Sequence, residues 1–393
     1  MSQDAQPVGV FCPTFLKPEM WHVYRQVVEP SRVRVQVFAF KRENPGRFPC
    51  DDVDLLPRSS LRWARRIWYK QILHSPQMAL PEECAAFHRA LKARAVWLLH
   101  IYFGNNGVFW LPLLHRRKIP AIVSFHGADV AVGFNTAAGQ KRLRELFAIA
   151  DLLLARSSSL REALISAGCD RDKIRIQRTG IPTSEFAYRM RPCPADGCFQ
   201  VLQACRLIEK KGLEVTLNAF ARFLSKRPGS RLVFAGDGPL RERLEQRAGE
   251  LGVGNRVTFT GFVGKDQLLE KYYESHLFIH PSETTPSGDT EGIPNSLLEA
   301  MATGLCPIAT DHSGIPEVIR HLENGVLVKE HDTDAVYHWM DRLTEDWGQA
   351  QELGRRAAET INRDFELAAQ IRNLESIYLE LIARSTRSGG HGD

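Results

Sequence analysis

Two glutamates in the C-terminal half of the chain, Glu291 and Glu299, are separated by seven residues. Apolar runs at 277–280 and 305–309 enclose them, so the stretch predicts strand, loop, helix and strand, which is a βαβ unit. An acid before such a helix can reach hydroxyls on one side of a bound phosphate, and an acid one turn into it can accept hydrogen bonds from a ribose diol. The spacing therefore favours binding of a nucleotide-sugar.

The helix between the two glutamates must supply the phosphate site. Pro294 suits its first position and Gly304 suits the residue after its last turn, so we expect the helix to span about 295–303. The free amides of a first turn carry partial positive charge and bind anions. The residues expected to form this donor-binding cradle are Ile293, Asn295, Ser296 and Leu297.

A simpler interpretation of the pair is that Glu291 stabilises the helix dipole and that Glu299 is a solvated helix residue. The neighbours of Glu299 weaken this alternative, because they are Leu297, Leu298, Ala300 and Met301. A carboxylate among apolar side chains usually has a partner, so the binding interpretation is preferred.

The motif Glu-x7-Glu, the glycine after its first glutamate and the continuation Glu-Ala-Met-Ala-Thr-Gly resemble the signature of the retaining glycosyltransferases of family 4. The resemblance implies an α/β protein with the GT-B fold, in which two Rossmann-like domains face a central cleft and a C-terminal helix crosses back to the first domain. The loop at 281–290 is similar to the form found in bacterial exopolysaccharide and colanic-acid-type transferases.

Length and composition agree with such a protein. A chain of 393 residues is long enough for two domains of ordinary size, and 44% hydrophobic with 25% charged residues is typical of a folded protein. No apolar run approaches the roughly 20 residues of a membrane span. We therefore expect a cytoplasmic protein, with peripheral contact at the inner membrane face as an open alternative. The eight cysteines show no CxxC pair and no zinc-site spacing, and receive no role.

We place an N-terminal acceptor-side domain at 1–187, a linker at 188–198, a C-terminal nucleotide-sugar-binding domain at 199–363, and a helix that packs back on the first domain, with a loose tail, at 364–393. The linker is assigned where the chain becomes rich in Arg, Pro and Cys without periodicity. Residues 1–187 hold 27 basic and 16 acidic residues, against 24 and 30 in the remainder. A basic half can attract nucleic acid, anionic lipid or a phosphorylated substrate, and charge alone does not choose among them.

His126 and Asp129 follow an apolar run at the carboxyl end of a predicted strand, where α/β proteins bind ligands. A lone histidine there is more often structural, but the resemblance implies that His126 contacts the donor sugar. We place Asp129 and His100 on the acceptor side, with a structural role for His100 as an equal alternative. The loop at 12–18 lacks the glycines that most family members carry after the first strand. The predicted strands of this domain are at 8–11, 32–40, 96–103, 121–125, 151–155 and 173–182.

Arg206 and Lys211 stand at a strand exit and a helix start in the second domain, where two cations can neutralise a pyrophosphate. An isolated Arg-x4-Lys is usually a solvated loop pair. This one, however, resembles the family's pair that clamps the donor diphosphate. The resemblance implies that Phe262 lies beside the nucleotide base. It also extends to Ser313 and Gly314, which can offer amides to the donor, and Gly236, after another predicted strand, is a further donor-binding candidate.

The segment 58–73 predicts a basic amphipathic helix with tryptophans. No acidic residue occurs between Asp54 and Glu82. In most proteins such a helix packs its apolar side on the core, and in the alternative it lies on an anionic membrane surface. The apolar side consists of Leu61, Ala64, Trp68 and Ile72.

The resemblance implies sugar transfer with retention at the anomeric carbon and without a cofactor or metal. The residues to which it assigns the chemistry are His126, Glu291, Arg206 and Lys211. The Asp-x-Asp sequences at 52–54 and 170–172 lie in polar connections, so we interpret them as solvated acids. Partners are then a UDP- or GDP-sugar and a glycan, expected to be linked to polyprenyl diphosphate, in exopolysaccharide, capsule or lipopolysaccharide assembly.

Three alternatives stay open at this point. The acceptor can be small and soluble, or the enzyme can hydrolyse or epimerise a nucleotide-sugar. In a different class, the chain can be a nucleotide-binding or nucleic-acid-binding protein, although no known nucleic-acid motif supports it.

Overall fold

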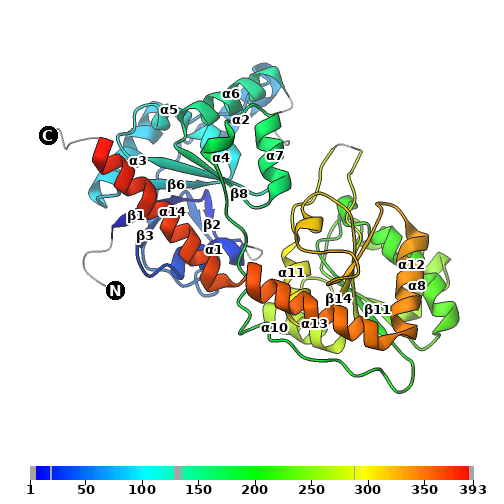
Figure 1. The fold of residues 1–393 in the computed structure, drawn as a ribbon. Coiled ribbons are helices and arrows are strands. Elements are labelled where there is room, and N and C mark those ends of the chain that lie inside the picture. Colours follow the sequence, from blue (N-terminus) through cyan, green and yellow to red (C-terminus); the bar gives the residue numbers. More distant parts are fainter. Residues whose placement is uncertain (1–5, 18–19, 128–133, 135, 287, 389–393) are drawn as a thin grey trace. The chain divides into compact units, whose positions relative to one another are not determined.

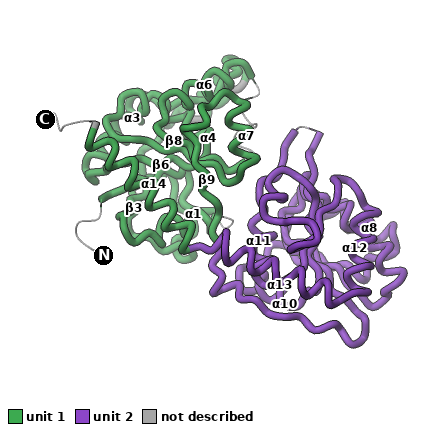
Figure 2. Tube along the Cα trace, in the orientation of Figure 1, with its two compact units in different colours: residues 1–180, 368–393 green, residues 181–367 purple. Residues whose placement is uncertain are grey.

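The computed structural model describes residues 6–17, 20–127, 134, 136–286 and 288–388. They form two compact units, one within residues 1–180 and 368–393 and the other within residues 181–367 (Figure 2). Each unit contains a parallel sheet covered by helices, so the expected α/β class with two Rossmann-like domains is confirmed. Within the described ranges, no helix combines the length and the apolar character needed to cross a membrane.

The described part of the N-terminal unit has a seven-stranded sheet in the order β5-β3-β1-β6-β7-β8-β9 (Figure 1). All of its pairings are parallel, as expected for buried, continuously apolar strands. The short β5 was not predicted. The strands are β1 (Pro7–Phe11), β3 (Arg34–Ala39), β5 (Val53–Leu55), β6 (Leu98–Tyr102), β7 (Ala121–Phe125), β8 (Leu152–Ala155) and β9 (Ile174–Ile176), and a separate ribbon pairs β2 (Thr14–Phe15) with β4 (Lys41–Arg42).

Alternate side chains of these strands enter two cores, one on each face of the sheet. Val123 and Phe125 of β7 join the first core, whereas Ile122 between them joins the second. The helices that cover the two faces are α1 (Trp21–Val28), α3 (Pro81–Ala93), α4 (Gly104–Phe109), α5 (Leu111–Leu114), α6 (Ala137–Ile149), α7 (Ser158–Ser166) and α14 (Leu367–Ser388).

The C-terminal helix α14 belongs to the N-terminal unit (Figure 2). Leu374 and Tyr378 are fully buried in the same core as β1. Glu375 is buried as well, and its carboxylate accepts hydrogen bonds from the backbone N–H groups of Ser31 (2.7 Å) and Arg32 (2.5 Å). Apolar burial and a buried carboxylate together fix α14 on this sheet.

The segment 58–73 differs from the more common arrangement expected for it. It forms the short helix α2 (Arg62–Ile67) and a π-helical turn (Trp68–Ile72). Arg65 faces inward, where its guanidinium donates to the carbonyl of Met78 (2.7 Å) and lies 3.7 Å from the carboxylate of Glu83. The buried carboxylate of Glu83 needs a cation beside it, and Arg65 supplies this charge from the inner side of the segment. The apolar side chains of the segment are therefore exposed to solvent. The expectation that this apolar side packs on the sheet is therefore wrong.

The described part of the C-terminal unit has a six-stranded sheet in the order β12-β11-β10-β13-β14-β15. Its pairings are also parallel. The strands are β10 (Gln200–Ala204), β11 (Arg231–Ala235), β12 (Val257–Phe259), β13 (Leu277–His280), β14 (Cys306–Thr310) and β15 (Val326–Val328). The helices are α8 (Leu213–Lys226), α9 (Arg241–Glu250), α10 (Lys265–Glu274), α11 (Asn295–Ala302), α12 (Thr333–Glu345) and α13 (Trp347–Asp364).

The helix α11 lies within one residue of the predicted span 295–303, although Pro294, expected at its first position, stands just before it. Pro294 precedes it as the N-cap, and Gly304 follows its last turn with a φ of +86°. The N–H of Gly304 donates to Met301 and that of Leu305 to Ala300, which is the Schellman arrangement of a helix end. This local chemistry is why the helix could be placed from the sequence.

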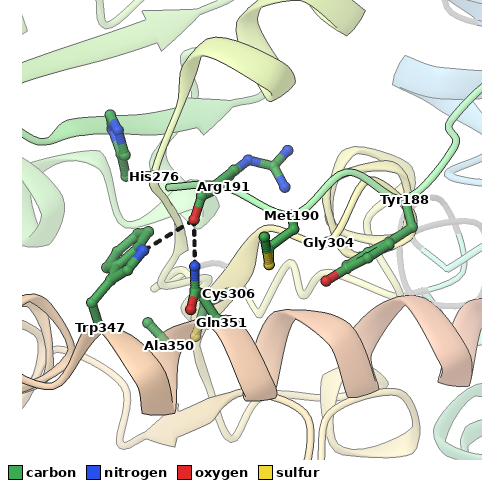
Figure 3. A pocket seen from close by; sticks show the side chains of 9 residues that line it. All are labelled: Tyr188, Met190, Arg191, His276, Gly304, Cys306, Trp347, Ala350 and Gln351. Atoms are coloured by element: carbon green, nitrogen blue, oxygen red, sulfur yellow. Dashed lines mark hydrogen bonds between the residues drawn. The ribbon is translucent and has the colours of Figure 1, made fainter. Parts of the chain in front are cut away.

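The segment 188–198, expected to be a linker, is part of the C-terminal unit. Arg191 is buried, and its guanidinium donates to the carbonyls of Tyr272 (2.9 Å), Ser275 (2.9 Å) and Thr303 (2.8 Å). Its own carbonyl accepts hydrogen bonds from the Trp347 indole and the Gln351 amide of α13 (Figure 3). The sequence lacks periodicity here because single side chains, rather than an apolar face, hold the segment in place.

We expect Arg191→Met to lower the free energy of unfolding of the C-terminal unit by about 3 kcal/mol. The carbonyls at the ends of α10 and α11 would stay buried without their donor, at about 1–3 kcal/mol each before relaxation. Differential scanning calorimetry of the full chain measures the loss. The matched control is Arg189→Met, because Arg189 is exposed and stacks on Tyr273 at 3.8 Å. Equal stability of both variants would contradict this assignment.

Candidate functional site

The strand order of the C-terminal sheet reverses between β10 and β13. The chain adds β11 and β12 on one side of β10, and then β13, β14 and β15 on the other side. Ligands of open α/β sheets bind beyond the carboxyl ends of the strands at such a point. The loop after β10 carries Arg206 and Lys211, and the loop after β13 carries Glu291. The two predicted cations and the first glutamate thus flank one position on the sheet edge.

The backbone around Lys211 is held in a single conformation. A 3-10 turn covers Glu209–Lys211, and Gly212 follows it with a φ of +60°. A Cβ atom at Gly212 would lie 1.9 Å from the carbonyl oxygen of Pro281, so only glycine lets the two loops approach this closely. The carbonyl of Lys211 accepts a hydrogen bond from Nε2 of Gln203 at 2.7 Å. Arg206, on the same loop, is exposed.

Lys211 and Glu291 form an ion pair in which 11% and 16% of the two side chains are exposed. Burial alone would raise the pKa of Glu291, but the charges of Lys211 and Lys210 and the hydrogen bond from Lys211 lower this pKa to about 2. The carboxylate is therefore ionised at neutral pH. Because its pKa falls below the ordinary 4.5, it stabilises the fold above about pH 4.5, and this contribution is lost as the pH falls towards 2.

The loop that carries Glu291 is tied to its neighbours on both sides. On one side, Nζ of Lys210 lies 3.1 Å from the carboxylate of Asp289 and 3.1 Å from the carbonyl of Thr290. On the other side, the backbone N–H of Glu291 donates to Nε2 of His312 at 2.9 Å. Glu291 is thus held through its carboxylate, its backbone and its loop.

The start of α11 lies at the same sheet edge, because the hydroxyl of Ser296 donates to the carbonyl of Ala204 at the end of β10 (2.6 Å). Glu299 has the partner that its apolar neighbours call for, since one of its oxygens accepts the hydroxyl of Tyr272 at 2.9 Å. Tyr272 is fully buried, so it fixes that carboxylate from the core side.

The side chains of Ile293 and Leu297 are buried in the core of the C-terminal unit, with 8% and 0% exposed. The N–H of Leu297 donates to the carbonyl of Pro294 at 3.2 Å. Among the predicted cradle residues, Leu297 therefore already uses its amide inside the helix. The role predicted for the amide of Asn295, at the first helical position, stays a prediction.

The remaining predicted donor-binding residues follow other strands of the same sheet. Gly236 comes directly after β11, and a Cβ atom there would lie 1.9 Å from the carbonyl oxygen of Cys205, so glycine lets this loop reach the loop that carries Arg206. Phe262 follows β12 and is 61% exposed. Ser313 and Gly314 follow β14. Their contacts with a donor stay predictions.

In the N-terminal unit, His126 follows β7 at the carboxyl edge of its sheet. Its ring centroid lies 4.6 Å from that of Phe103 and 5.5 Å from that of His22. The sequence analysis did not identify His22 as a candidate. Burial, reinforced by the charge of Arg156, lowers the pKa of His126 well below its ordinary value. A neutral imidazole can exchange hydrogen bonds with a sugar hydroxyl without placing a charge against it.

His100 lies inside β6 and is 1% exposed. Its Nδ1 is 2.6 Å from the hydroxyl of Tyr378 in α14, and burial lowers the pKa of His100 to about 3. This contact favours the structural alternative for His100. Asp129, the other residue expected on the acceptor side, lies outside the described residues.

Comparison with known proteins identifies the family. Residues 22–185 match Glycosyltransferase Family 4, and residues 194–360 match Glycosyl transferases group 1. The chain is 31% identical to the amylovoran biosynthesis glycosyltransferase AmsK of Erwinia amylovora over 312 residues. This alignment covers 79% of this chain and 75% of AmsK. The chain belongs to the glycosyltransferases of family 4. WcaL of Escherichia coli K12, whose name refers to colanic acid biosynthesis, is 31% identical over 281 residues, 70% of this chain and 68% of WcaL.

Solved structures share the fold of this glycosyltransferase. The UDP complex of HepE from Anabaena aligns with a TM-score of 0.75 over 95% of this chain and 100% of that chain, at 18% sequence identity. The GT-B fold expected from the sequence is thereby confirmed.

Sequence reasoning missed three polar residues at the site edge of this glycosyltransferase: His280, His312 and Glu330. His280 ends β13, is fully buried, and finds no hydrogen-bond partner for either ring nitrogen among the described residues. Burial lowers the pKa of His280 to about 3. His312 and Glu330 each lie two residues beyond a strand, β14 and β15. The rule that singled out His126, a polar residue just after a parallel strand, could have found His312 and Glu330 but not His280, which lies inside its strand.

Proposed function

We propose that this glycosyltransferase transfers a sugar from a UDP- or GDP-sugar to a glycan acceptor, with retention at the anomeric carbon and without a metal ion. The observation that carries the proposal is the buried pair of Lys211 and Glu291 beside the start of α11. A fixed cation suits the donor diphosphate, and a fixed carboxylate suits hydroxyls of the transferred sugar. A site for a nucleotide alone would gain nothing from that carboxylate, because its charge opposes a phosphate.

The proposed chemistry is electrostatic. Arg206, Lys211 and the first amides of α11 stabilise the diphosphate as it departs, when its negative charge is larger than in the ground state. Glu291 positions the sugar, and Glu299 binds the ribose. The contact of His126 with the sugar, which the resemblance implies, stays a prediction. Positive charge from side chains takes the role that a metal ion has in other transferases.

The Asp-x-Asp sequences support the metal-independent proposal, because two of their carboxylates already have partners. Asp54 receives two hydrogen bonds from Arg94, at 2.6 and 2.8 Å. Asp170 caps a short turn by accepting the N–H of Asp172 at 3.0 Å. One carboxylate of each sequence is thus already bound by donors of the protein itself.

We also propose that the acceptor is linked to a lipid, at the inner membrane face, in exopolysaccharide assembly. AmsK and WcaL carry names from polysaccharide biosynthesis. The further support is the apolar surface of segment 58–73. Six of its apolar side chains are 46–65% exposed, and Trp63 and Ile67 among them lie outside the predicted apolar side: Leu61, Trp63, Ile67, Trp68, Ile72 and Leu73. Large apolar side chains that are exposed together in one segment commonly mark a binding site.

The chemistry around this apolar surface favours anionic lipid as the partner. Arg58 and Arg66 are exposed beside it, and the sequence has no acid between Asp54 and Glu82. Tryptophan suits the boundary between headgroups and acyl chains, and arginine suits lipid phosphates. A second copy packed through the same segment would place these arginines against each other, because the segment contains no acid.

A thermal-shift screen against UDP, GDP, ADP and their sugar conjugates tests the donor site. We expect one nucleotide to stabilise the enzyme selectively, by about 2.7 kcal/mol at about 100 times its Kd. Glu299→Ala should lose most of this shift because it removes the ribose ligand. The control Glu345→Ala, on the exposed end of α12, should keep it. Absence of any shift at about millimolar nucleotide would contradict the proposed donor site.

Flotation with vesicles that contain anionic phospholipid tests the membrane contact. We expect the full chain to bind, and binding to weaken at least about tenfold between about 0.1 and 1 M salt, where the screening length falls from about 10 to 3 Å. The double variant Trp63→Ser, Trp68→Ser should lose binding, while Met190→Ser, which alters an exposed apolar residue of the C-terminal unit, should not. A tryptophan variant that binds like the wild type would contradict the proposal, as would wild-type protein that dimerises through this surface instead.

A further inference from the structure

His312 connects two of the loops at the site edge and is 2% exposed. Its Nε2 accepts the backbone N–H of Glu291 at 2.9 Å, and its Nδ1 lies 2.7 Å from a carboxylate oxygen of Glu330. A backbone N–H can only donate, so Nε2 must be free of a proton. The proton of the neutral ring is therefore on Nδ1, where it faces Glu330. The carboxylate selects the one tautomer that can hold Glu291.

Glu330 also holds the other end of the same loop. Its second carboxylate oxygen accepts the backbone N–H of Thr284 at 2.7 Å. Burial opposes ionisation of Glu330, but the hydrogen bonds from His312 and Thr284 lower its pKa below the ordinary value, so it stays an acceptor at neutral pH. One carboxylate, directly and through His312, thus fixes residues 284 and 291 at the two ends of the loop.

The hydrogen bond between His312 and Glu291 matters because Lys211 has two roles: it pairs with Glu291 and, in the proposed function, which the inference presupposes, it binds the donor diphosphate. A cation shared with a phosphate holds its carboxylate partner less tightly, because the two anions compete for it. The hydrogen bond from the backbone of Glu291 to His312 does not involve the donor and is unaffected by that competition.

We propose that His312 and Glu330 are positioning residues that keep Glu291 directed at the transferred sugar when a nucleotide-sugar binds. His312 and Glu330, called the dyad below, act on the sugar half of the donor only. Its loss should therefore weaken binding of a nucleotide-sugar more than binding of the matching nucleotide.

Two substitutions at position 312 separate the two hydrogen bonds of the ring. The carbonyl oxygen of a glutamine stands near the place of Nε2 and can accept the N–H of Glu291, whereas an asparagine amide reaches only the place of Nδ1 and Glu330. We expect His312→Asn to weaken binding about tenfold, the scale of one or two lost hydrogen bonds, for the sugar conjugate only. His312→Gln should restore most of that affinity. Glu330→Leu should resemble His312→Asn.

Isothermal titration calorimetry with UDP against UDP-glucose, and with GDP against GDP-mannose, measures the difference. The matched control is His331→Asn, because His331 also faces a glutamate, Glu283, at 3.0 Å but is 63% exposed and has no contact with Glu291 in the described structure. Its ratio of the two dissociation constants should equal that of the wild type.

Nitrogen-15 NMR of the histidine rings provides a readout that does not depend on any substrate. We expect the proton of His312 on Nδ1 in the wild type and shared between both nitrogens in Glu330→Leu. A proton on Nε2 in the wild type would overturn the proposal, and so would equal weakening of nucleotide and nucleotide-sugar in His312→Asn. Wild-type protein that binds no nucleotide would instead overturn the proposed function, and with it the role of the dyad in donor binding.

Discussion

Lys211→Met is expected to lower kcat at least about 100-fold, the usual scale for removal of one preorganised electrostatic donor. The cation is fixed before the reaction by Gly212, by the hydrogen bond from Gln203 and by Glu291, so little reorganisation is needed when charge develops on the diphosphate. Release of the nucleotide from the donor found in the screen measures the rate. The control Lys226→Met alters a half-exposed lysine of α8 that pairs with Asp341, and it should keep the wild-type rate.

A folding defect must be separated from this effect, because Lys211→Met leaves the nearly buried carboxylate of Glu291 without its cation. That carboxylate would then take up a proton more readily, since burial raises its pKa and only the weaker opposing charge, that of Lys210, remains. The double variant Lys211→Met, Glu291→Gln removes both charges and should recover most of the lost stability while staying inactive. Recovery of activity along with stability would contradict a catalytic role for Lys211.

Arg206 shares the task in the proposed mechanism, and Arg206→Met should reduce the rate by a similar order. Its side chain is exposed, so no stability change is expected. Unchanged turnover in this variant would remove Arg206 from the mechanism and leave Lys211 with the amides of α11 as the source of positive charge.

The parts of the fold that could be predicted from the sequence are those fixed by local patterns. Continuous apolar runs identified most strands of both sheets, because strands buried on both faces need apolar residues throughout. Pro294 and Gly304 placed α11 because each suits its position at the helix end through its own backbone conformation. The donor-site candidates followed in part from the order of strand, loop and helix, which places loops at one sheet edge, and in part from the resemblance to family 4.

The parts that could not be predicted depend on partners far away in the sequence. The apolar surface of segment 58–73 points outward because Arg65 meets Glu83, and segment 188–198 is fixed because Arg191 meets carbonyls of α10 and α11. A helical period records which residues share a face, but not which face is buried. The link from Glu330 through His312 to Glu291 was missed for the same reason, since its members come from three different loops.

Glu291→Gln is expected to lower kcat at least about 100-fold with little effect on nucleotide affinity, whereas Glu299→Gln should act mainly by raising KM for the donor, about tenfold. The two glutamates differ in what holds them. The carboxylate of Glu291 is ionised and paired with Lys211, so in the proposed mechanism its loss alters the charge balance where the bond to the leaving group breaks. The carboxylate of Glu299 is anchored by the hydroxyl of buried Tyr272, and its loss removes hydrogen bonds that are equal in the ground and transition states.

Steady-state kinetics with the donor, together with calorimetric titration of the nucleotide, separates the two effects. Tyr272→Phe provides the matched control for the second glutamate, because it removes the anchoring hydroxyl and keeps the ring in the core. It should raise KM in the same direction as Glu299→Gln, by a smaller factor. If both glutamate variants changed the same kinetic parameter, the division between a sugar-positioning Glu291 and a ribose-binding Glu299 would be wrong, and the pair would act as one structural unit around α11.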